Sequence, residues 1–140
     1  MAVYFYDKIE DSLLKFAVIL AKYKGKYIFC KHKKRDTLEI PGGHREKSEA
    51  IDETARRELR EETGAIHFDM KPICVYSVTE KNLKGNETFG MFYYAEIKLL
   101  DPVLHNEIEK IVITDALPDN WTYPNIQPDL IGEAKRRGFL

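Results

Sequence analysis

The chain has 140 residues, of which 44% are hydrophobic and 32% charged, and its 22 lysines and arginines against 23 aspartates and glutamates leave a net charge of −1. This length predicts a single domain, residues 1–140, and the apolar share is large enough for a core, which excludes a disordered chain. The near-neutral charge argues against a general nucleic-acid coat and against a polybasic membrane-binding protein.

The sequence contains no predicted membrane segment or secretory leader. Its longest apolar run, 16–21, is far shorter than the roughly 20 residues that cross a bilayer. The first residues include Asp7 and Asp11 and lack a basic region followed by an apolar one. Cys30 and Cys74 fall in apolar runs without C-x-x-C spacing, so we expect reduced core cysteines in a cytoplasmic protein.

The pattern of apolar residues and turn residues predicts an alternation of strands and helices. The expected elements are, in chain order, strands at 16–21, 27–30 and 38–40, a helix at 48–64, strands at 73–79, 89–97 and 111–113, and a helix at 127–138. A turn around Gly25 joins the first two strands, and a turn at 82–86 joins the two long ones. This order predicts an α+β fold, with helices packed against a mixed sheet.

The first predicted helix has a clear start and end. Ser48 is a favourable N-cap with Glu49 in the first turn, and Gly64 is a favourable residue just past the last turn. Before it, Pro41, Gly42 and Gly43 form a turn that lets the backbone approach a ligand closely near the helix N-terminus.

Acidic side chains fall on the apolar face of this helix. With Ile51 at zero and about 100° per residue, Glu58 lies near 340°, Glu62 near 20° and Glu61 near 280°. Carboxylates pointed toward a core are costly unless they are paired or bound to a metal, and like charges four residues apart repel. Converging carboxylates suit a hard divalent cation, of which Mg2+ fits best. Arg57 could reach Glu61 one turn later and hold it.

The same segment resembles a family motif. Gly43, five residues, Glu49, seven residues and then Arg57-Glu-Leu-Arg-Glu-Glu-Thr-Gly-Ala65 is similar to the Nudix box, G-x5-E-x7-R-E-U-x-E-E-x-G-U, where U is a bulky aliphatic residue. Every fixed letter is met, and the only departure is the small Ala65 at the last position. The resemblance implies the Nudix αβα sandwich, a mixed curved sheet between helices.

The resemblance also implies a reaction and residue roles. Nudix proteins hydrolyse a nucleoside diphosphate linked to another group, using Mg2+ or Mn2+. Glu58 and Glu62 would be metal ligands, Glu61 a further ligand or the base that activates water, and Arg57 an orienting residue. The Gly42 carbonyl could be another ligand.

Family members often place one more acid after the last long strand. Glu107 and Glu109 are the candidates here, and alternation puts both on one face of an extended segment, with a slight preference for Glu107. The resemblance gives Glu49 a structural, helix-capping role. The four histidines lack zinc spacing, so we expect none to be a metal ligand and His44 to lie in the loop at the mouth of the site.

Substrate residues are less constrained. A basic run without acids, 22–35, leads into the strand before the helix, and Arg35 is its best candidate for binding phosphate. Trp121 could stack on a base or belong to the core, and Asn125 could read a base edge. The segment 124–128 is loosely similar to the region where MutT-type enzymes, the Nudix hydrolases of oxidised guanine nucleotides, use an asparagine.

These features predict hydrolysis of a nucleoside triphosphate to a monophosphate and pyrophosphate, with 8-oxo-dGTP as a candidate substrate. Within the family, the alternatives are RNA 5′-pyrophosphohydrolysis and the hydrolysis of ADP-ribose or nucleotide sugars. A non-catalytic nucleotide-binding regulatory domain is the alternative from another class. The expected partner is a small nucleotide, with no membrane contact and no extended nucleic-acid surface, although an RNA 5′ end stays open. The oligomeric state is not predicted.

Overall fold

The computed structural model describes residues 2–79, 86–101, 103 and 107–140. Its elements are, in chain order, β1 (Ala2–Tyr6), a short 3-10 helix (Asp11–Leu13), β2 (Leu14–Tyr23), β3 (Lys26–His32), β4 (Gly42–His44), α1 (Ile51–Thr63), β5 (Ala65–Thr79), β6 (Glu87–Leu100), β7 (Ile108–Thr114) and α2 (Gln127–Arg136). The predicted turn at 82–86 lies almost wholly outside the described residues.

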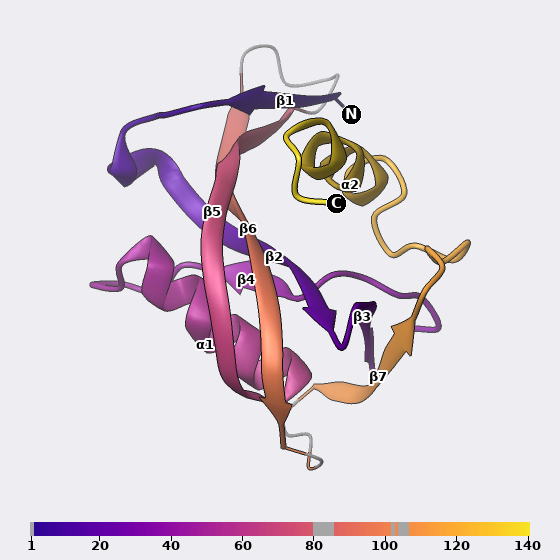
Figure 1. Ribbon diagram of the computed structural model, residues 1–140. Helices are drawn as coiled ribbons and strands as arrows, with labels where there is room; N and C mark the ends of the chain where they lie inside the picture. The colour runs from indigo at the N-terminus through magenta and orange to yellow at the C-terminus, as the bar shows by residue number, and fades with distance from the viewer. Residues whose placement is uncertain (1, 80–85, 102, 104–106) are drawn as a thin grey trace.

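The strands form one mixed sheet in the order β1-β5-β6-β2-β3-β7, with β4 paired to β2. The pair β2 and β6 is parallel, whereas the other pairs are antiparallel. Figure 1 shows the long strands β5 and β6 running through the middle of the molecule, with α1 and α2 well apart. The predicted α+β class and the αβα sandwich are confirmed.

Each helix covers its own apolar cluster, because alternate residues of a strand point to opposite faces of the sheet. Ala55 and Leu59 of α1 pack with residues such as Ile19 and Tyr93. Leu130 of α2 packs in a second cluster with aromatic and aliphatic residues that include Leu20, Phe29, Phe92 and Tyr76. Both cysteines are buried and unbridged, as expected.

The start of α1 differs from the prediction. The helix begins at Ile51 with Ala50 as N-cap, and Ser48 lies in the preceding turn with a φ of 66°. The Glu53 carboxylate accepts a hydrogen bond from the Ala50 N–H, so a residue inside the helix supplies the cap. The predicted end is confirmed, because Gly64 adopts a left-handed φ of 79° that favours glycine.

Two short segments before α1 also differ. Residues 38–40 form no continuous strand but make isolated bridges, Cys30 with Glu39 and Leu38 with Trp121. The expected turn at Gly42 and Gly43 is strand β4, which pairs with β2. The predicted hairpin between β2 and β3 is confirmed, with Lys24 and Gly25 at positive φ.

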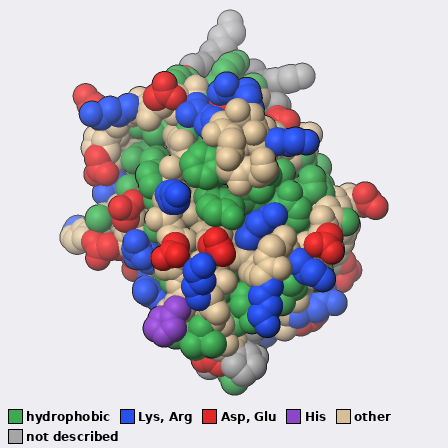
Figure 2. All heavy atoms as spheres, viewed as in Figure 1, with side chains coloured by type: hydrophobic (Ala, Val, Ile, Leu, Met, Phe, Trp, Pro, Cys, Tyr) green, Lys and Arg blue, Asp and Glu red, His purple; other side chains and the backbone are tan. Residues whose placement is uncertain are grey.

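No described helix is long and apolar enough to span a bilayer. On the face drawn in Figure 2, acidic and basic side chains are interspersed and gather into no single-sign field.

The last helix supplies a test of stability. Glu133 is 8% exposed and accepts hydrogen bonds from Arg136 and Arg137, which lower the pKa of its carboxyl to about 2. The stabilisation of the folded state by these ion pairs is therefore present above the unfolded-state pKa of about 4.3 and is lost as the pH falls toward 2. We expect Glu133→Gln to lower the free energy of unfolding at pH 7 by about 1–2 kcal/mol, less than the full shift because the arginines are partly solvated.

Urea denaturation at pH 7 and pH 3 measures this effect. The difference between wild type and variant should shrink at pH 3, while the exposed Asp119→Asn control should match wild type at both. An equal loss at both pH values would contradict the ion-pair origin.

Candidate active site

The carboxylates on the sheet-facing side of α1 lie against the backbone of β4. Glu62 is 8% exposed, and its Oε1 accepts a hydrogen bond from the Gly42 N–H at 2.8 Å. A Cβ added to Gly43 would overlap the carboxyl group of Glu58. The absence of a side chain at Gly43 therefore leaves the space for the Glu58 carboxylate, and the predicted inward orientation of Glu58 and Glu62 is observed.

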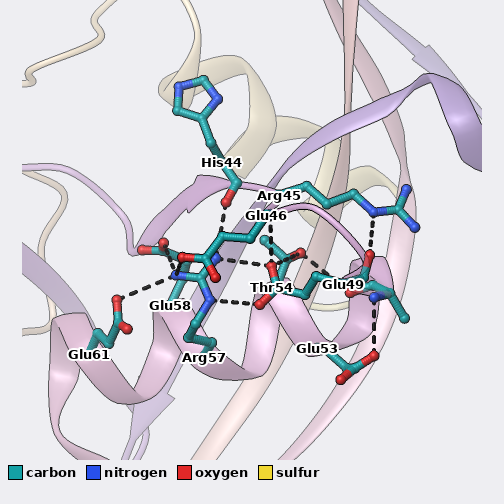
Figure 3. A network of polar contacts seen from close by, with 10 residues as sticks. His44, Arg45, Glu46, Glu49, Glu53, Thr54, Arg57, Glu58 and Glu61 are labelled. Carbon is teal, nitrogen blue, oxygen red and sulfur yellow. Dashed lines mark hydrogen bonds and ion pairs between the residues drawn. The ribbon is translucent and has the colours of Figure 1, made fainter.

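Arg57 connects the acids of this region, as Figure 3 shows. Its guanidinium donates to Glu58 Oε1 at 2.7 Å, to Glu49 at 2.7 and 3.0 Å, and to the His44 carbonyl at 3.0 Å. Its contact with Glu61, the one expected from the sequence, is longer at 3.5 Å. The Arg57 guanidinium therefore positions carboxylates from α1 and from the turn before it.

Glu49 has the structural role that was expected, by contacts other than those of an N-cap. Its carboxylate accepts hydrogen bonds from Arg57, from the Thr54 hydroxyl and from the Glu46 N–H. These bonds hold the pKa of Glu49 at about 2. The carboxylate stays ionised and ties the turn to the helix.

Negative charge accumulates around the buried carboxylates of Glu62 and Glu58. Burial, together with the nearby carboxylates of Glu58, Glu39 and Glu61, raises the pKa of Glu62 to about 8, although the Gly42 hydrogen bond acts in the opposite direction. Burial also raises the pKa of Glu58, in spite of Arg57. Crowded, partly desolvated carboxylates of this kind are stabilised by a cation. Among the described residues, however, no group of three His, Cys, Asp or Glu side chains is already drawn together for a metal.

Two residues that the sequence analysis did not assign to this site, His32 and Glu39, lie near Glu62. His32 Nε2 lies 3.4 Å from Glu62 Oε2 and 3.6 Å from Glu39 Oε1, and this buried nitrogen has no hydrogen-bond partner in the described part of the chain. Glu39 is 7% exposed. The bridge between Cys30 and Glu39 brings Glu39 beside His32, a local pairing that the residue pattern does not reveal.

A cavity of about 660 Å³ opens beside these groups. It runs from β4 along the α2 face of the sheet to the start of α2. Its lining includes Glu39, Gly42, Gly43, His44, Phe16, Val18, Tyr76, Val78, Tyr123, Gln127 and Leu130. His44 lines this cavity from strand β4, and not from the loop that the sequence had predicted. Ligand pockets commonly have this size and this mixture of apolar walls and few polar groups.

The predicted substrate residues occupy different environments. Arg35 is 44% exposed and donates to Glu39 at 2.9 Å, so it lies next to the cavity wall. Trp121 packs edge-on against Phe29, with ring centroids 5.4 Å apart, and belongs to the α2-side core. Asn125 is exposed. Neither Trp121 nor Asn125 is among the described residues that line the cavity.

The two candidate acids near β7 also differ. Glu109 pairs with Lys31 at 3.0 Å. Glu107 is 87% exposed, and its carboxylate lies 3.9 Å from His32 Nδ1, on the other side of the imidazole from Glu62. Glu107 and the α1 residue Glu62 therefore lie beside the two nitrogens of the same imidazole, whereas Glu109 is engaged with Lys31.

Comparisons with known proteins agree with this architecture. The NUDIX domain model matches residues 12–122, which cover most of the chain. The chain therefore belongs to the Nudix hydrolase family and is an enzyme of the class that acts on phosphoanhydride bonds. Members of this family typically use divalent metal ions.

Individual relatives give finer detail. The chain is 32% identical over 119 residues to the Bacillus subtilis (strain 168) protein named "Putative 8-oxo-dGTP diphosphatase YtkD", covering 83% of this chain and 72% of that protein. The fold of the present chain matches that of a variant of the B. subtilis pyrophosphohydrolase BsRppH with a TM-score of 0.79 at 24% identity. The match covers 98% of this chain and 92% of BsRppH. A MutT NUDIX hydrolase from Burkholderia pseudomallei matches with a TM-score of 0.64 at 19% identity, over 83% and 94%.

The space at Gly43 provides a test of the site. Gly43→Ala should displace the Glu58 carboxylate and weaken the binding of Mn2+ by about tenfold or more, since disturbing residues around a metal ligand commonly costs 10- to 100-fold. Electron paramagnetic resonance of free Mn2+ measures the affinity, and thermal unfolding monitors the fold.

A matched control is available in α2. Gly132 has open space around the position of an added Cβ, so Gly132→Ala should bind Mn2+ like wild type and gain up to about 1 kcal/mol of stability. Unchanged Mn2+ binding by a folded Gly43→Ala protein would contradict the placement of the site.

Proposed function

We propose that the protein is a Mg2+-dependent nucleoside triphosphate diphosphatase that releases a nucleoside monophosphate and pyrophosphate, with 8-oxo-dGTP as a candidate substrate. The observation that carries this proposal is the position of the cavity. Its lining includes Gly42 and Gly43, against which the Glu62 and Glu58 carboxylates lie, and also an aromatic wall of Phe16 and Tyr76. A base and a phosphate chain would thus each meet suitable groups.

The carboxylate cluster next to Gly42 and Gly43 would hold the cation. Glu58, Glu61, Glu62 and the Gly42 carbonyl are the proposed ligands, joined by Glu107, with Glu109 as the alternative. Bound Mg2+ or Mn2+ would neutralise phosphate charge and lower the pKa of the attacking water. Glu61 is 44% exposed on its side chain, which supports its alternative role as the base that takes the proton of that water.

The remaining residues would position these groups. Arg57 fixes Glu58 through a 2.7 Å hydrogen bond and keeps its carboxylate in place. Arg35 is the proposed contact for a phosphate beyond the reach of the cation. It pairs with Glu39 at 2.9 Å and is half-exposed, so donors of its guanidinium can face solvent.

The aromatic wall supports a nucleoside as the other half of the substrate. The rings of Phe16 and Tyr76 lie 5.3 Å apart, and both line the cavity. Stacking of a base on aromatic side chains contributes about 1–3 kcal/mol. The 32% identical relative named for 8-oxo-dGTP supports a purine nucleotide.

Product analysis tests the reaction. With Mg2+ and a panel of ribo- and deoxynucleoside triphosphates, including 8-oxo-dGTP, we expect pyrophosphate and a monophosphate without orthophosphate. If only triphosphorylated RNA, ADP-ribose or nucleotide sugars are hydrolysed, the proposed nucleoside triphosphate substrate is wrong and the hydrolysed compound takes its place. Binding without turnover of any of these compounds would identify a regulatory binding domain.

Replacement of a proposed ligand tests the site. Glu62→Gln should lower kcat by about two orders of magnitude or more, because the amide lacks the charge that holds the cation. The Gly42 N–H can still donate to the amide oxygen, so thermal unfolding should change little. The exposed Glu53 on the opposite side of α1 provides the control, as Glu53→Gln should keep full kcat. Equal activity of the two variants would contradict the assignment of Glu62.

A further inference from the structure

The imidazole of His32 is held beside the end of α1 by the contacts of its neighbours. Cys30 and His32 are two residues apart in β3, so both point to the same face of the sheet. The Cys30 Sγ donates to the Glu62 carbonyl at 3.3 Å, and His32 faces the carboxylate of that same residue. The Lys33 N–H donates to the Glu107 carbonyl at 2.8 Å and ties the end of β3 to the start of β7. The position of the His32 ring, 15% exposed on its side chain, is therefore fixed from two sides.

The Nε2 atom of His32 lies between two carboxylates. It is 3.4 Å from Glu62 Oε2 and 3.6 Å from Glu39 Oε1, and within the described residues this buried nitrogen has no hydrogen-bond partner. The ionised carboxylates that a cation requires only accept hydrogen bonds, so we assign the proton of the ring to Nε2. Glu39 and Glu62 are 7% and 8% exposed, and burying two such groups side by side without a donor is costly.

Of these two carboxylates, Glu62 is the one that lacks a second donor. Glu39 Oε1 already accepts a hydrogen bond from Arg35 at 2.9 Å. Glu62 Oε1 accepts one from the Gly42 N–H at 2.8 Å, but no hydrogen bond among the described residues reaches Glu62 Oε2, which faces His32. A carboxylate held at one oxygen can rotate about that bond, whereas donors at both oxygens define the direction of its remaining lone pairs.

We propose that His32 is a positioning residue that orients the Glu62 carboxylate for the divalent cation, through a hydrogen bond from Nε2–H to Oε2. This inference rests on the proposed function, because it concerns the cation site of the same enzyme. Carboxylates that bind a metal are themselves held by hydrogen bonds, and loss of such a partner commonly weakens metal binding by roughly 10- to 100-fold. The same donor lies between Glu62 and Glu39, so it also reduces the repulsion between them.

Two substitutions separate the donor from the rest of the side chain. His32→Gln keeps a nitrogen donor near the position of Nε2, whereas His32→Leu keeps an apolar body without a donor. We expect Mn2+ to bind about tenfold or more weakly to His32→Leu and within about threefold of wild type to His32→Gln, measured by electron paramagnetic resonance of free Mn2+. This readout needs no substrate. Equal losses in both variants would overturn the hydrogen bond.

Matched controls come from the exposed His67 in β5. His67→Gln and His67→Leu make the same two changes away from the carboxylate cluster, so both should bind Mn2+ like wild type. Thermal unfolding monitors the fold of all four variants.

A double-mutant cycle tests whether His32 acts through Glu62. In the Glu62→Gln background no carboxylate is left at this position for His32 to orient, so adding His32→Leu should change Mn2+ affinity by less than about twofold. A loss of the same size in both backgrounds would show that leucine weakens the site in another way, and it would overturn the role of His32.

The ring itself gives a spectroscopic signature. In a long-range proton–nitrogen correlation spectrum of the protein with Mg2+, we expect His32 Nε2 to carry the proton. A bare Nε2, or equal Mn2+ binding by wild type and His32→Leu, would overturn the role of His32 and leave the proposed reaction standing. Mn2+ binding that depends on His32, without hydrolysis of any triphosphate, would instead overturn the proposed reaction and leave the role of His32 supported.

Discussion

The geometry of the acidic site depends on the Arg57 guanidinium. Several carboxylates that repel one another lie at one end of the sheet, and this side chain contacts those of Glu49, Glu58 and Glu61. Its planar fork allows several donors to act at once, whereas a lysine would supply a single point charge. Because Arg57 also binds the His44 carbonyl, the turn, the strand β4 and the helix are held in one arrangement.

The parts of the site that follow from helical periodicity were predictable from the sequence. The inward position of Glu58 and Glu62 results from the 3.6-residue repeat, and the apolar face of α1 fixes which side meets the sheet. Five of the six predicted strands lie within β2, β3, β5, β6 and β7, whereas residues 38–40 make only isolated bridges. Local patterns were sufficient wherever one face of an element had to be buried.

Contacts that depend on the pairing of separate segments were not predictable. Glu39 meets His32 only because of a bridge to Cys30, and Gln127 meets Ile40 across 87 positions of sequence. The predicted N-cap of α1 was also wrong. Ser48 is a good capping residue in general, but it takes a positive φ in this turn. The pairing of β4 with β2 overrode the tendency of two glycines to form a turn.

The attachment of α2 has a consequence for how the protein is made on the ribosome. The cavity receives Tyr123, Gln127 and Leu130 from the C-terminal part of the chain, whereas the carboxylate cluster and the core on the α1 side come from residues before them. During synthesis the residues of the carboxylate cluster therefore leave the ribosome before the residues that complete this cavity wall. The cavity is closed on this side only when the C-terminal part of the chain packs against the sheet.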